Sequence, residues 1–222
     1  MAKQKTAQSS TAGFKNALSL YAILLIVWGF YRVFLKIDDR VEEIFIKPIV
    51  WLGPLVFFLK KEGVGISSLG WVSTNLFKSI YLSLGLGALF GGVGLASHFA
   101  KYGGKISFSS FGLDSNTLAI TLFVSFVTAI VEESVFRGYI LTRLRGPLGE
   151  MGAIFATTIA WVVIHLPVLI FAYQMGIGDL GIRFLLTFVF GLGSSILFLR
   201  TKNIVSSILL HVLWSWPIIL FR

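Results

Sequence analysis

The sequence contains no cysteine. Disulfides, iron–sulfur clusters, cysteine nucleophiles and cysteine-based zinc sites are therefore excluded. Charged residues are also scarce, at 13% of the 222 residues, against roughly 25% in a soluble domain. We find no internal repeat, no long linker and no alternation typical of barrel strands. The composition places the chain outside the ordinary soluble proteins.

Apolar residues make up most of what is present, at 56% of the chain with a mean hydropathy of +0.87. A helix that spans a membrane needs about 20 mostly apolar residues. Seven stretches qualify or nearly do: 17–35, 44–59, 76–100, 117–141, 151–173, 180–199 and 204–221. Backbone groups in lipid must pair internally, which favours helices. The sequence therefore predicts an all-α, polytopic transmembrane helix bundle of about seven spans.

The polar, lysine-bearing residues 1–16 are predicted to be an N-terminal tail, and residues 17–222 one transmembrane helical domain. The second stretch holds Pro48 and Pro54, so it is expected to be tilted, kinked or re-entrant. Lysine and arginine are moderately enriched in the loops that share a side with the N-terminus, which predicts a cytoplasmic N-terminus. We expect an integral protein of a prokaryotic plasma membrane.

The net charge of +9 is explained by basic residues in cytoplasmic loops and near anionic lipid. No basic cluster is interleaved with exposed aromatic residues, so nucleic-acid binding is not expected. The expected partners are membrane lipid and a protein or peptide substrate at the membrane.

Ionisable residues inside the apolar stretches are few, and each is costly enough in lipid to suggest a function. Those singled out are Glu132, Glu133, Arg137, His165 and His211, from three of the stretches, whereas His98 and Arg183 lie near the ends of their stretches, where an interfacial position explains them. Adjacent residues on a helix point about 100° apart, so Glu132 and Glu133 are not expected to share one role. Glu133 and Arg137 are four residues apart and predict a structural ion pair. Glu132 is then expected to be the freer carboxylate.

Each of these residues also has a simpler interpretation. Glu132 and Glu133 could reach water at the membrane interface, and His165 or His211 could be a hydrogen-bonded packing residue. Ser215 follows His211 by four residues and shares its helix face. Together, two carboxylates and two imidazoles from three stretches are sufficient for acid–base chemistry.

The pattern resembles a known family. Glu132-Glu133-x-x-x-Arg137, then Trp161-x-x-x-His165, then His211 is similar to the motifs of the CPBP family (CAAX proteases and bacteriocin-processing enzymes, also called Abi), which includes the type II CAAX prenyl endopeptidases. The resemblance covers a catalytic core at about 117–216. The chain departs from the family at Trp161, where phenylalanine is usual, and at Ser215, where asparagine or aspartate is usual.

The resemblance implies an intramembrane endopeptidase that hydrolyses a peptide bond of a membrane-associated or prenylated, CAAX-like protein or of a leader peptide. Glu132 would be the general base on a water that His165 helps to position, and His211 with Ser215 would stabilise the oxyanion. A metal-free mechanism is favoured. Zinc is the alternative, with Glu132, His165 and His211 as ligands, because two histidines and a glutamate form a zinc ligand set. The His-Glu-x-x-His helix motif of zinc proteases is absent.

Two other classes of function remain open at this point. Ser215 motivates an inactive family member that acts as a membrane scaffold or regulator. Intramembrane glutamate and histidine could also serve a proton relay in a small transporter. A transporter predicts inverted repeats, and the sequence has no detectable repeat.

Overall fold

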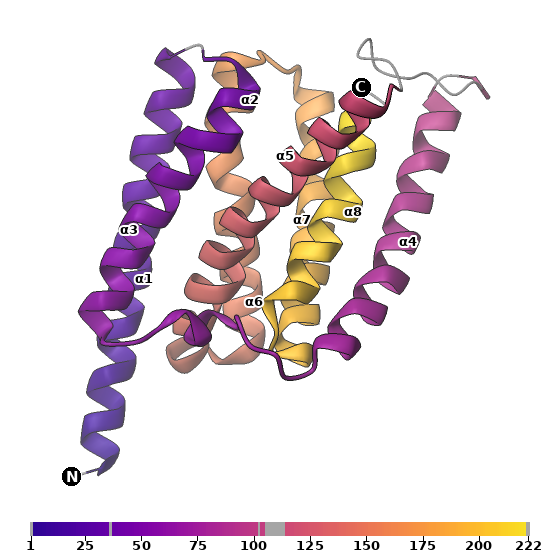
Figure 1. The fold of residues 1–222 in the computed structure, drawn as a ribbon. Coiled ribbons are helices and arrows are strands. Elements are labelled where there is room, and N and C mark those ends of the chain that lie inside the picture. Colours follow the sequence, from indigo (N-terminus) through magenta and orange to yellow (C-terminus); the bar gives the residue numbers. More distant parts are fainter. Residues whose placement is uncertain (1, 36, 102, 105–113, 221–222) are drawn as a thin grey trace.

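The computed structural model describes residues 2–35, 37–101, 103–104 and 114–220, and within them every regular element is a helix (Figure 1). The predicted all-α class is therefore confirmed. Residues 1, 221 and 222, which the predicted boundaries include, lie outside the described residues.

The helices follow one another along the chain with short connections. They are α1 (Ala2–Phe34), α2 (Asp39–Val41), the π-helix η1 (Glu42–Ile46), α3 (Lys47–Glu62), the 3-10 helix η2 (Ile66–Leu69), α4 (Leu76–Lys101), α5 (Ser115–Glu133), the π-helix η3 (Ser134–Leu141), α6 (Thr142–Pro167), the π-helix η4 (Val168–Ala172), α7 (Ile177–Thr201) and α8 (Ile204–Leu220).

The predicted count of about seven spans is not confirmed. Among the described residues, four helical stretches are long and apolar enough to cross a membrane: Thr11–Phe34, Leu76–Ala96, Ser115–Ala172 and Ile177–Thr201. The third is 58 residues long and contains two of the predicted spans. Its backbone leaves helical geometry at Gly149 (φ 70°, ψ 178°), where α6 is kinked. The helix α3 has only 16 residues, and the apolar helix Ile204–Pro217 is likewise short.

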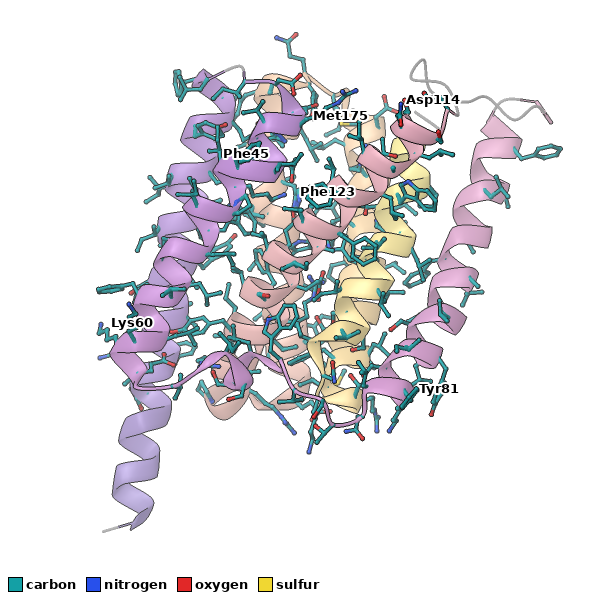
Figure 2. The ribbon with its side chains drawn as sticks, viewed as in Figure 1. Phe45, Lys60, Tyr81, Asp114, Phe123 and Met175 are labelled. Atoms are coloured by element: carbon teal, nitrogen blue, oxygen red, sulfur yellow. The ribbon has the colours of Figure 1, made fainter. Side chains whose placement is uncertain are left out.

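The bundle has two ends, which orient everything that follows. At the N-terminal end, α1 begins, α3 ends and α4 begins; at the distal end, α1 ends, α3 begins and α5 begins (Figure 1). Figure 2 shows Lys60 near the N-terminal end and Asp114 and Met175 near the distal end. Glu132 follows the start of α5 by 17 residues and precedes the end of η3 by nine, so it lies within the bundle.

Buried aromatic residues pack around the interior. Trp51 is fully buried, with ring centroids 5.4 Å from Trp28 and 5.8 Å from Phe136. The ring centroids of Trp161 in α6 and Phe190 in α7 are 5.2 Å apart. Each aromatic side chain buries roughly 150–250 Å². These rings form part of the buried hydrophobic core of the bundle.

Candidate active site

Glu132 is 2% exposed and is held by donors from two other helices. Lys47 of α3 donates from Nζ to Oε1 at 2.5 Å, and Trp161 of α6 donates from Nε1 to Oε2 at 2.8 Å. The prediction that Glu132 is the freer carboxylate is therefore wrong. Lys47 is separated from it by 85 residues in sequence, and the fold brings its ammonium directly onto the carboxylate.

His165 lies beside the same carboxylate. Its Nδ1 is 2.7 Å from the carbonyl oxygen of Trp161. A carbonyl can only accept, so Nδ1 carries the hydrogen, and in the neutral ring Nε2 presents a lone pair. Nε2 is 3.9 Å from Glu132 Oε1. The His165 side chain is 31% exposed, against 3% for Glu132, so His165 is on the more accessible side of the pair.

Glu133 belongs to a second set of contacts. Its Oε1 accepts from Arg137 Nη1 at 3.1 Å and pairs with His211 Nδ1 at 2.8 Å, while its Oε2 accepts from Ser194 Oγ at 2.9 Å. The predicted Glu133–Arg137 ion pair is present and fully buried. His211 therefore contacts Glu133, whereas the sequence had associated it with Glu132.

Adjacent residues on a helix point about 100° apart, and Glu132 and Glu133 accordingly bond to different partners. They end α5, and the π-helix η3 starts at the next residue; such segments often occur at functional sites.

Gly191 of α7 allows the close approach of Arg137, which donates to its carbonyl at 3.3 Å. A Cβ at Gly191 would lie 2.8 Å from Thr158 Cγ2. A larger residue there would push the helices apart.

The indole of Trp161 joins the two sets. Its ring centroid lies 5.3 Å from that of His165 and 5.8 Å from that of His211, and the Arg137 guanidinium carbon is 4.7 Å from it. We call Glu132, Glu133, His165, His211 and the side chains bonded to them the polar centre. The structure thus brings together the two carboxylates and two imidazoles that the sequence singled out.

Ser215 lies one helical turn beyond His211 on α8. Its hydroxyl oxygen is buried and makes no hydrogen bond within the described part of the chain. A buried hydroxyl without a partner is costly. Ser215 therefore has an unused donor on the face that carries His211.

The alternative zinc ligand set does not fit this geometry. Lys47 places a positive charge 2.5 Å from Glu132 Oε1, and His211 directs Nδ1 to Glu133 instead. Within the described part of the chain, no three histidine, aspartate or glutamate side chains are grouped so that they could hold a metal ion. Glu132, His165 and His211 lie near one another but are not arranged around a common point for an ion.

Sequence reasoning missed Lys47 and Ser194. A signal for Lys47 was present, because Glu43 and Lys47 are four residues apart at the start of an apolar stretch, and their side chains do pair at 2.8 Å. Ser194 carried no such signal. It lies among the small residues 191–195, and small residues by themselves indicate only close helix packing.

A buried carboxylate–imidazole centre within a bundle of apolar helices marks a functional site and is suited to acid–base chemistry. The Type II CAAX prenyl endopeptidase Rce1-like family matches residues 114–217, a stretch that contains all six predicted site residues. This match confirms the resemblance found in the sequence and supports a CPBP/CAAX protease family assignment over those residues. No curated protein and no solved structure matches the chain.

Proposed function

We propose that the protein is an intramembrane endopeptidase that activates a water between Glu132 and His165 to cleave a membrane-associated or prenylated substrate. The observation that carries the proposal is the 3.9 Å separation between Glu132 Oε1 and His165 Nε2, two atoms that can both accept. A water about 2.8 Å from each atom fits between them. It would donate one hydrogen to each and turn a lone pair outward.

Each step of the proposed hydrolysis has a residue to perform it. The water oxygen attacks the scissile carbonyl carbon while Glu132 takes its proton, and the C–N bond then breaks as that proton passes to the leaving amine. His211, when doubly protonated, can donate from Nε2 while Nδ1 remains on Glu133. The Ser215 hydroxyl is a second donor. Both would stabilise the oxyanion of the tetrahedral intermediate.

The test is a cleavage assay with the purified protein in proteoliposomes. The substrates are a farnesylated peptide with a CAAX terminus, the same peptide without the lipid, and a membrane-anchored leader peptide, with products identified by mass spectrometry. We expect cleavage of a lipidated or anchored peptide, also in the presence of a chelator. A folded protein that cleaves none of them would favour the scaffold alternative.

Ser215→Asn is expected to raise the cleavage rate by up to about tenfold, which is ~1.4 kcal/mol of transition-state stabilisation. The longer amide reaches further than the hydroxyl while remaining a donor. Ser215→Ala, which removes the donor, should lower kcat with little change in KM. Steady-state kinetics of the two variants check this, and equal rates for all three proteins would remove Ser215 from the proposed oxyanion site.

The charges at the two ends support a cytoplasmic N-terminal end. Counted between the predicted spans of the full sequence, lysine and arginine number eleven on the side of the N-terminus and eight on the other side. The eleven are Lys3, Lys5, Lys15, Lys60, Lys61, Lys78, Arg137, Arg143, Arg145, Arg200 and Lys202, and the eight are Arg32, Lys36, Arg40, Lys47, Lys101, Lys105, Arg183 and Arg222. Short cytoplasmic loops carry an excess of lysine and arginine. We propose that the tail 1–16 lies in the cytoplasm of a prokaryotic cell and that residues 17–222 form one membrane domain.

Single cysteines at opposite ends of this cysteine-free chain test that topology. In intact cells, a membrane-impermeant maleimide should label Met175→Cys at the distal end and leave Lys60→Cys unlabelled until the cells are opened (Figure 2). The reverse pattern would contradict the proposed orientation.

A further inference from the structure

Lys47 is the most unusual side chain outside the family motifs, because its ammonium is buried in the bundle. The side chain is 3% exposed. Its Nζ lies 5.2 Å from the ring centroid of Trp28 and 5.4 Å from that of Trp51, on faces that favour a cation. Removing a charge from water costs several kcal/mol, and only close partners offset that cost. Its position needs an explanation beyond packing.

Two carboxylates share this ammonium. Nζ donates to Glu132 Oε1 at 2.5 Å and to Glu43 Oε2 at 2.8 Å, and Thr128 Oγ1 also donates to that Glu43 oxygen at 2.7 Å. Beyond them, Arg32 pairs with Glu42 at 2.7 Å and lies 3.8 Å from Glu43. Lys47 is therefore fixed from the distal side by a network that does not include Glu132.

The oxygen that Lys47 contacts is the one that faces His165. Glu132 Oε1 accepts from Lys47 and also lies 3.9 Å from His165 Nε2, whereas Glu132 Oε2 accepts from Trp161. A carboxylate oxygen has two lone pairs, so it can accept from Lys47 and from a water at the same time. With both oxygens anchored from different helices, the carboxylate cannot rotate away from the imidazole.

We propose that Lys47 is a positioning residue of the active site, acting as the counter-ion that holds Glu132 Oε1 against the water shared with His165. This inference rests on the proposed function and extends the site to a residue of α3 outside the matched residues 114–217. Lys47 does not touch the substrate. It acts through Glu132, so α3 contributes a residue to the active site.

The test compares kcat and KM of Lys47→Met with those of Lys60→Met. Both variants remove a lysine from α3, and Lys60 is exposed near the N-terminal end (Figure 2). We expect Lys47→Met to lower kcat about 10- to 100-fold with KM unchanged, the size of effect seen when a supporting residue of an active site is removed. Lys60→Met should match wild type. Lys47→Arg, which retains the charge, should recover part of the loss.

Folding defects are separated by a second measurement. Lys47→Met leaves Glu132 buried without its cation, so its thermal unfolding midpoint should fall; adding Glu132→Gln should recover part of that loss, because the unpaired charge is then gone. Independent, additive effects on unfolding would contradict the pairing. Unchanged or increased kcat in a folded Lys47→Met would overturn the positioning role, as would a folded Lys47→Arg that is no faster than Lys47→Met.

The failures of the two proposals are distinguishable. If wild type cleaves, Glu132→Gln does not, and Lys47→Met cleaves at the wild-type rate, only the inference on Lys47 fails. If wild type cleaves nothing, the proposed function fails, and a positioning role in that reaction falls with it. The unfolding measurements still decide whether Lys47 and Glu132 are energetically coupled.

Discussion

Glu132→Gln is expected to lower kcat for peptide cleavage by about 10²–10⁴-fold, the usual contribution of a general base. Glutamine keeps the size of the side chain and can still accept from Lys47, but it cannot take the proton of the water. KM should change little, because the residue acts on water and not on substrate binding. Steady-state cleavage in proteoliposomes measures both parameters.

The matched control is Glu150→Gln. Glu150 is exposed and pairs with Arg145 at 2.9 Å near the N-terminal end, away from the polar centre. Such exposed pairs contribute little to stability, so this variant should cleave as wild type does. Cleavage by Glu132→Gln at the wild-type rate would show that Glu132 is not the base.

Arg137→Ala is expected to destabilise the fold by about 3–5 kcal/mol, the cost of leaving a buried charge without its partner. The Glu133–Arg137 pair is fully buried, and Arg137 also donates to the carbonyl of Gly191. Its loss removes a connection between η3 and α7. Thermal unfolding followed by the fraction of monodisperse protein should show a lower midpoint and a lower folded yield.

Arg145→Ala is the control, since that side chain is 49% exposed. Surface changes of this kind usually stay within about 0.5 kcal/mol. An Arg137→Ala protein that unfolds at the wild-type midpoint but no longer cleaves would place Arg137 in the chemistry, which contradicts its assignment as a structural residue.

Local spacing predicted the parts of the site that are local in sequence. Glu133 and Arg137 pair as their four-residue separation indicates, and the adjacent glutamates do point to different partners. The pairing of Lys47 with Glu132 depends on how α3 docks against α5, over 85 residues of separation. No periodicity in one stretch predicts which side chain of another stretch will lie opposite.

Hydropathy predicted helices well and their number less well. Four stretches of the described residues are long and apolar enough to span, against about seven expected, and the two spans predicted within 117–173 fall on either side of the break in helical geometry at Gly149. Hydropathy also could not predict the π-helix η3 after Glu133, because it carries no information on the hydrogen-bond register within a helix. The association of His211 with Glu133 depends on how α8 packs against α5, which hydropathy does not describe either.

The central claim is that Glu132 and His165 act on one water, and a double-mutant cycle on kcat/KM tests it most directly. The cycle compares wild type, Glu132→Gln, His165→Asn and the double variant in the same proteoliposome assay. Residues that act as a unit are strongly non-additive. We expect the double variant to be about as slow as the slower single variant. A double variant whose loss equals the product of the two single losses would show that the residues act independently, and the shared water would be ruled out.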